Sequence, residues 1–264
     1  MAEPAVLYEV RDHVAEITLN RPDNRNSMTE DVFQGLNEAV AQVKADRELR
    51  CVIITGRGRS FCAGADFKAG VQRGGDDGEF VLPNERSYGM YQPFLQILDI
   101  EVPTIAAMQG HAIGGGLGLA IVCDMRVANI TSKYGANFTR LGLHPGMASS
   151  YILPRLVGLP KALELLLTGR LVSGAEAAEL GLANHAAEGE GVLKKARELA
   201  AEIAGAAPIA VRWAKQSIYR NIDWNPRDAA RIEAHAQSRT IETEDGREGI
   251  KALLEKRSPV FKGR

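Results

Sequence analysis

The sequence predicts an α/β core followed by a helical C-terminal region, and three observations carry this prediction. Short apolar stretches typical of buried parallel strands recur along the first half of the chain, at 51–55, 103–110 and 124–129. Loops and helical patterns separate these stretches in a β-loop-α-β order, which favours a layered α/β core. The last third of the chain is almost entirely helical in pattern. We therefore expect a core over residues 1–200 and a helical region over 201–264 that packs on the core or on a neighbouring subunit.

The elements of the first half follow from local patterns. Residues 6–10 and 14–20 alternate as strands and predict a hairpin. Thr29 is expected to cap a helix that runs to about residue 45, with one apolar face formed by Val32, Leu36, Ala39, Val40 and Val43. Residues 70–84 carry turn residues and charge, which predicts a mobile surface segment, and a helix over 85–99 follows it.

Local patterns also predict the elements of the second half of the chain. Helices are expected at about 147–157 and 160–168, and a third begins at Ser173, with Glu176 as its capping-box partner, and ends at Gly181. A last strand over 182–187 precedes the C-terminal helices, which we expect at about 190–205, 208–221 and 226–256, the last of them interrupted near Gly246. The sequence contains no recognisable internal repeat.

Composition excludes several classes of protein. The 264 residues carry 32 basic and 33 acidic side chains, so no global field attracts nucleic acid or an anionic membrane. Three cysteines fit reduced thiols rather than a disulfide framework, and no cluster of Cys and His predicts a metal site. The chain shows no secretory signal pattern and no apolar run of membrane-spanning length, so the cytoplasm is the expected compartment.

Two predicted strands end in glycine-rich loops, and these loops are the candidate site. The stretch "CVIIT" leads into "GRGRSFCAGAD", and "TIAAMQG" leads into "HAIGGGLG". Ligands of open α/β sheets bind at the carboxyl ends of strands, and glycine lets them approach the backbone. One N–H group from each loop would form an oxyanion hole. The alternative for either loop alone is a tight turn, and a dinucleotide fingerprint fails because Phe61 and Leu119 stand where its last glycine is needed.

Five blocks in this order resemble the crotonase superfamily of enoyl-CoA hydratases and isomerases. They are "NRPDNRNSM" (20–28), "FCAGAD" (61–66), "GHAIGGGLGLAIVCD" (110–124), "LTGRLVSGAEAAELGLA" (167–183) and "EKRSPVFKGR" (255–264). The resemblance implies a crotonase-like ββα superhelix, the ClpP/crotonase fold, with a helical C-terminal trimerisation region in a homotrimer or dimer of trimers. It also implies an acyl-CoA ligand whose thioester oxygen lies between the N–H groups of Ala65 and Gly115.

The resemblance further implies which residues contact coenzyme A, which would be part of the substrate rather than a permanently bound cofactor. These residues are Asn24, Arg25, Asn26, Ala63, Asp66, Phe67, Phe261 and Lys262. Simpler interpretations remain open for some of them. Arg25 fits a solvated surface residue equally well, and Asp66 fits a cap that holds its own loop.

The usual acids of the family are absent. Family hydratases carry one glutamate two residues after the GGG run and another in an FGxxE-like stretch, while some isomerases carry an acid after the proline of "LGxxPE". Here these three places hold Gly118, Phe138 and Gly146. His144 is the local substitute proton carrier that the sequence offers, because imidazole ionises near neutral pH. A turn histidine facing solvent or another subunit is its alternative role.

Other candidates favour structural roles. His111 precedes the glycine run and Asp124 follows the helix, and both are expected to support the fold. Tyr88 and Tyr91 lie on the helix that borders the acyl pocket in the family, and an aromatic residue at helical spacing is more often core. Two serines, Ser149 and Ser150, lack the His and Asp partners of a catalytic triad.

These observations lead to one leading function and two alternatives. The leading hypothesis is an enzyme of the hydratase/isomerase class, active in fatty acid metabolism, that stabilises a thioester enolate with Ala65 and Gly115. The first alternative is a catalytically silent acyl-CoA-binding protein. The second is a divergent hydrolase of C–C or thioester bonds that uses His144.

Overall fold

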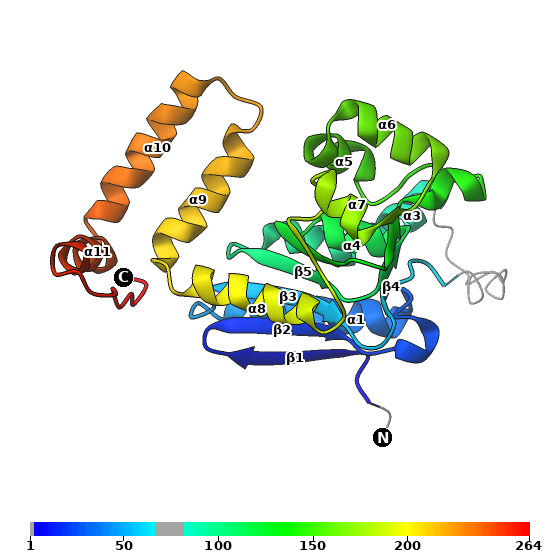
Figure 1. Ribbon diagram of the computed structural model, residues 1–264, viewed down its shortest axis with the longest axis horizontal. Coiled ribbons are helices and arrows are strands. Elements are labelled where there is room, and N and C mark those ends of the chain that lie inside the picture. The colour runs from blue at the N-terminus through cyan, green and yellow to red at the C-terminus, as the bar shows by residue number, and fades with distance from the viewer. Residues whose placement is uncertain (1–2, 67–81) are drawn as a thin grey trace.

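The computed structural model describes residues 3–66 and 82–264 and confirms the mixed α/β architecture (Figure 1). Nearly all of the expected mobile segment 70–84 lies outside these residues. A six-stranded sheet contains, in spatial order, β1 (Val6–Arg11), β2 (Val14–Leu19), β3 (Cys51–Gly56), β5 (Thr104–Met108), β7 (Met125–Asn129) and β10 (His185–Ala187). A four-stranded sheet contains β4 (Ser60–Cys62), β6 (His111–Ile113), β8 (Lys133–Gly135) and β9 (Val172–Ser173).

The two sheets are built from a repeated ββ unit that the sequence does not reveal. In each of the pairs β3–β4, β5–β6 and β7–β8, the first strand joins the large sheet and the second joins the small one. Helix α3 (Pro83–Leu95) follows the first pair and α4 (Gly115–Ile121) follows the second. The second strands were not predicted, because three residues are too few to show a hydrophobic period. Their repetition forms the ββα superhelix that the resemblance implies.

The large sheet is buried on both faces. Strand β3 pairs in parallel with β2 and β5, and all of its residues are buried. Val52 and Ile54 face the main hydrophobic core, whereas Cys51 and Ile53 face a second cluster covered by α8 (Gly191–Ala204). This two-sided burial explains why the strand sequence is continuously apolar rather than alternating.

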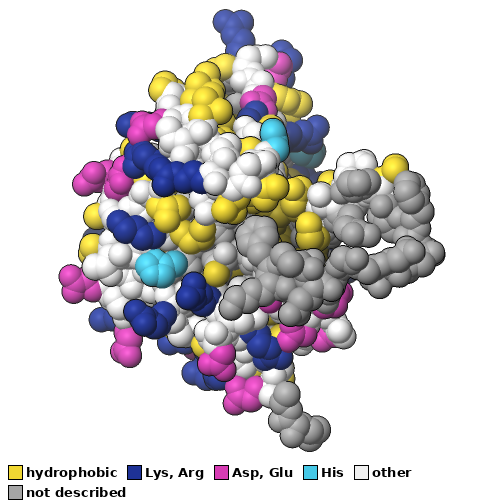
Figure 2. Space-filling view, turned by 90° about the vertical axis from the view of Figure 1, so that its right-hand side faces the viewer, with side chains coloured by type: hydrophobic (Ala, Val, Ile, Leu, Met, Phe, Trp, Pro, Cys, Tyr) yellow, Lys and Arg dark blue, Asp and Glu magenta, His cyan; other side chains and the backbone are white. Residues whose placement is uncertain are grey.

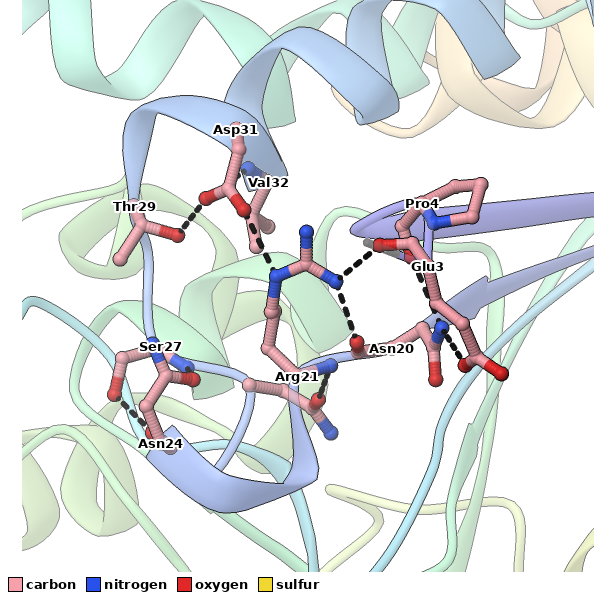
Figure 3. Close-up of polar contacts among 10 residues, drawn as sticks. Glu3, Pro4, Asn20, Arg21, Asn24, Ser27, Thr29, Asp31 and Val32 are labelled. Carbon is pink, nitrogen blue, oxygen red and sulfur yellow. Dashed lines mark hydrogen bonds and ion pairs between the residues drawn. The ribbon is translucent and has the colours of Figure 1, made fainter. Parts of the chain in front are cut away.

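Helix α1 (Glu30–Ala45) buries the five apolar residues that were predicted for its inner face. The predicted N-cap position of Thr29 is confirmed, but its side chain does not make the capping hydrogen bond. Thr29 occupies the N-cap position, but its hydroxyl donates to the Asp31 carboxylate instead of accepting from the helix (Figure 3). Asp31 accepts the N–H of Val32 at 3.0 Å, so Asp31 satisfies that amide in place of Thr29. The hydrogen bond from Thr29 is the main reason that the pKa of Asp31 is lowered.

Helices α5 (Ser149–Val157), α6 (Leu159–Thr168) and α7 (Gly174–Glu179) follow the predicted order. Ser173 caps α7, since its hydroxyl accepts the N–H of Glu176 at 3.2 Å. The reciprocal half of the predicted capping box is wrong, because the Glu176 carboxylate binds Arg170 at 2.7 Å instead. Short 3-10 helices complete the core and are η1 (Pro22–Asn24), η2 (Gln96–Asp99) and η3 (Asn137–Leu141).

The chain ends in three helices, α9 (Pro208–Asn221), α10 (Pro226–Ile241) and α11 (Glu244–Leu254). Figure 1 shows α9 and α10 side by side and standing away from the sheets, with the C-terminus beside α11. The predicted break near Gly246 is confirmed and falls at residues 242–243, where the Thr243 hydroxyl accepts the N–H of Gly246 and starts α11. Within the described ranges, no helix is both long and apolar enough to cross a membrane.

Candidate active site

The two glycine loops meet at one pocket of about 460 Å³. Met28 donates its N–H to the carbonyl of Gly64 at 2.9 Å and forms a parallel bridge with Ala65, which ties the N-terminal loop to the second loop. A Cβ on Gly64 would lie 3.2 Å from the amide nitrogen of Gly115, so the second loop and the start of α4 are in contact. Both Ala65 and Gly115 line the pocket.

Glycine is required at each of the first positions of α4 for a different physical reason. Gly114 has a φ of +56°, a left-handed conformation that glycine adopts most readily. A Cβ on Gly115 would collide with the Met28 side chain, 2.5 Å from its Cε. A Cβ on Gly116 would run into the backbone carbonyl of Cys62. Gly116 therefore serves the packing of α4 on β4.

Two backbone amides at this pocket have no acceptor within the described chain. The first hydrogen bond inside α4 runs from Gly118 N to Gly114 O at 3.1 Å, which leaves the N–H of Gly115 outside the helical pattern. In the Met28–Ala65 bridge, the second loop contributes the carbonyl of Gly64, and the N–H of Ala65 makes no hydrogen bond to residues 3–66 or 82–264. Two N–H groups without an acceptor at one pocket are able to donate hydrogen bonds to a ligand oxygen.

Other residues fill the space of the absent acids. A Cβ on Gly118 would lie 2.5 Å from Met147 Cβ and 2.7 Å from its Cγ, so Met147 occupies the place of a glutamate side chain. A Cβ on Gly146 would meet the hydroxyl of Tyr91. Phe138 lines the pocket itself. Among the described residues that line the pocket, none is Asp or Glu, and the groups able to carry a proton are Ser87, Tyr91 and His144.

His144 lies at the exposed rim of the pocket. Its Nδ1 is 2.8 Å from the carbonyl oxygen of Pro145. Because a carbonyl only accepts, Nδ1 is the donor of this hydrogen bond. No carboxylate of the described chain orients the ring, and this arrangement gives no support to a His144-dependent hydrolase.

The predicted coenzyme A contacts in the N-terminal loop differ in whether their side chains are accessible to a ligand. Asn26 is fully buried, and its amide donates to the carbonyls of Arg57 and Ser60 while its oxygen accepts the N–H of Arg21. Its side chain therefore shapes the loop and presents nothing to a ligand. Arg25 is exposed, and Asn24 is half-buried and bonded to Ser27 (Figure 3).

The remaining predicted contacts are spread over the molecule. Ala63 lines the pocket and donates its N–H to the carbonyl of Arg25 at 3.1 Å, and Asp66 is half-buried at the end of the same loop. Phe67 lies outside the described residues. Phe261 and Lys262 do not line the pocket of their own chain. This segment is instead held at the start of α11, where the buried carboxylate of Asp245 accepts the N–H of Lys262 at 2.7 Å.

The cysteines are free and buried, as the reduced-thiol prediction requires of the described chain. Burial raises the pKa of each thiol to about 12, so none is a thiolate nucleophile at neutral pH.

His111 has a supporting role in the fold, since its Nδ1 accepts the N–H of Lys133 at 2.9 Å. No local sequence pattern predicts the contacts that Met28 and Met147 make at this pocket.

Figure 2 shows hydrophobic side chains gathered near the centre of one face of the molecule. Met90, Leu141 and Leu143 line the pocket and are each about half exposed, at 46%, 51% and 46%. Exposed apolar side chains around a pocket with few polar groups are typical of a small-molecule site.

A superhelix of ββα units with two glycine loops at one pocket defines a member of the crotonase superfamily. A model of the enoyl-CoA hydratase/isomerase family matches residues 9–264. The chain belongs to this enoyl-CoA hydratase/isomerase family.

Relatives agree with this membership. The bovine "Enoyl-CoA hydratase domain-containing protein 2, mitochondrial" is 42% identical over 95% of this chain and 84% of its own. The (E)-benzylidenesuccinyl-CoA hydratase of Thauera aromatica is 35% identical over 98% and 99%. The crystal structure of an enoyl-CoA hydratase from Bacillus anthracis has a TM-score of 0.89 at 34% identity and covers 98% of this chain and 100% of its own.

Proposed function

We propose that the protein binds an acyl-CoA thioester and stabilises its enolate through the N–H groups of Ala65 and Gly115. The observation that carries the proposal is the pair of free amides at the pocket. Negative charge grows on the thioester oxygen as an enolate forms, so fixed donors stabilise the transition state more than the ground state. Removal of one such donor typically costs roughly 2.7–4 kcal/mol of transition-state stabilisation. Hydration and double-bond isomerisation of enoyl-CoA both pass through this kind of intermediate.

The test uses ligands that differ only at the thioester oxygen. We expect butyryl-CoA to bind at least tenfold more tightly than its S-butyl thioether analogue, because the thioether has no oxygen to accept the two hydrogen bonds. Isothermal calorimetry measures both affinities, and the infrared carbonyl stretch of bound butyryl-CoA should shift to lower frequency. Equal affinities together with an unshifted stretch would rule out the oxyanion hole.

A catalytically silent acyl-CoA-binding protein is the second candidate. It is favoured by the described pocket lining, which contains no carboxylate to activate water. The loss of crotonyl-CoA absorbance separates the two candidates, since saturable binding without turnover supports the silent protein. Turnover at ordinary enzyme rates supports the enzyme.

Restoring the acids should restore hydration, but only if space is made for them. We expect Gly118→Glu with Phe138→Glu to give no hydratase activity while Met147 is present, because the new Cβ meets Met147. Adding Met147→Gly removes this collision and suits the left-handed backbone of residue 147, whose φ is +59°. The triple variant should hydrate crotonyl-CoA roughly a hundredfold faster than the parent protein. Equal activity in the double and triple variants would contradict this interpretation of Met147.

We further propose a homotrimer or dimer of trimers in the cytoplasm, in which the C-terminal helices contact a neighbouring copy. Several large apolar side chains of α9, α11 and the segment between α9 and α10 are about half exposed or more within one chain, and they are Ile218, Ile222, Trp224, Leu253 and Leu254. Apolar surface of this kind on projecting helices is typical of protein–protein contacts.

A further inference from the structure

Tyr91 is held over the pocket by its own helix. Phe94, one turn further along α3, is 1% exposed and packs edge-on against Phe33 of α1, with ring centroids 5.6 Å apart. This anchor fixes the C-terminal turns of α3, which carry Tyr91 as well as Phe94. Tyr91 is half-buried and lines the pocket, whereas Tyr88 on the same helix is 59% exposed and does not.

The hydroxyl of Tyr91 lies where residue 146 would place a side chain. A Cβ on Gly146 would collide with this oxygen and lie 2.9 Å from Tyr91 Cζ. Gly146 is followed directly by Met147, which contacts Gly118 in the middle of α4. One helical turn separates Gly118 from Gly115. A continuous path of contacts therefore links the phenol to the helix that carries one of the two free amides.

The hydroxyl of Tyr91 has no structural hydrogen bond in the described chain, unlike the hydroxyls of two other tyrosines. The hydroxyl of Tyr134 donates to the carbonyl of Met108 at 2.9 Å, and that of Tyr219 donates to Asp124 at 2.7 Å. The hydroxyl of Tyr91 makes no hydrogen bond to residues 3–66 or 82–264. Buried or half-buried tyrosine hydroxyls usually find a partner, and an unpaired one that faces a pocket is available to a ligand.

We infer that Tyr91 is the proton carrier of this site and exchanges a proton with the α-carbon of the bound thioester. The inference rests on the proposed function, because it needs the enolate held by Ala65 and Gly115. In the forward step, the O–H bond of Tyr91 breaks and the enolate electron pair forms a new C–H bond at the α-carbon. The negative charge passes from the enolate oxygen to the phenolate, which then takes a proton from water. In the reverse step, the phenolate removes the α-proton.

The experiment measures deuterium uptake at the α-carbon of butyryl-CoA in D₂O by mass spectrometry. The wild-type protein should exchange this position. Tyr91→Phe should slow the exchange at least a hundredfold, with butyryl-CoA affinity unchanged within about twofold. Tyr88→Phe, from the same helix, is the matched control and should exchange like the wild type.

Gly146→Ala tests the geometry independently, because its methyl group displaces the hydroxyl. It should slow exchange in the wild-type background and have no further effect in Tyr91→Phe, since both changes act on the same group. Unchanged exchange in Tyr91→Phe would overturn the inference, and so would wild-type binding without any exchange. A folded wild-type protein that does not bind butyryl-CoA would overturn the proposed function itself, so the two failures are distinguishable.

Discussion

Gly116→Ala is expected to destabilise the fold by about 3 kcal/mol or more, which corresponds to a fall in melting temperature of roughly 6–12 °C. The added Cβ would collide with the backbone carbonyl oxygen of Cys62 and lie 2.6 Å from its carbonyl carbon. That carbonyl belongs to β4, whose three residues are all buried, so neither backbone can move without disturbing the small sheet. Thermal unfolding followed by circular dichroism measures the effect.

Gly89→Ala is the matched control for this prediction. Gly89 lies within α3, has no other described part of the chain within 4 Å of a Cβ, and does not have a left-handed backbone. Alanine is the better helix former, so this variant should gain about 0.5–1 kcal/mol. Similar stabilities for the two variants would show that the contact with Cys62 does not require glycine at 116.

Asp124→Ala is expected to lower the free energy of unfolding by an amount on the order of 3–5 kcal/mol. The reason is that the substitution leaves the nearly buried ammonium of Lys215 without its counterion. The side chains of Asp124 and Lys215 are 15% and 11% exposed, and their charged atoms are 2.8 Å apart. Asp124 also accepts the N–H and hydroxyl of Thr104 and the hydroxyl of Tyr219. Burial, followed by the charge of Asp124, raises the pKa of Tyr219. This network attaches α9 to the large sheet, which supports a structural role for Asp124.

Two further variants separate the charge from the packing. Asp124→Ala with Lys215→Met should be more stable than the sum of the two single losses predicts, since no unpaired charge remains. Glu9→Ala removes an exposed ion pair with Arg11 and should change stability by at most about 1 kcal/mol. Chemical denaturation gives all of these free energies. A loss in Asp124→Ala no larger than that in Glu9→Ala would contradict the role assigned to the network.

Local sequence patterns predicted correctly those features that depend only on residues within one helix, strand or turn. The inner face of α1, the doubly buried strand β3 and the Ser173 cap were all predicted, because each depends on residues within a few positions. The short strands of the small sheet were missed, because a three-residue strand is stabilised by its neighbours in space and not by its own sequence. Thr29 shows the same limit, since a nearby carboxylate took the hydrogen bond that its position predicted.

The sequence by itself determined the family, the α/β class and the two glycine loops, and its resemblance to the family predicted the loss of three carboxylates. It could not determine what replaces them. The tertiary structure decided that Met147 takes the space beside Gly118 and that the Tyr91 hydroxyl takes the space beside Gly146. It also assigned Gly116 to packing rather than to the ligand. The physical reason is that these contacts join residues up to 55 positions apart, and side-chain volume is shared between segments that have no common local pattern.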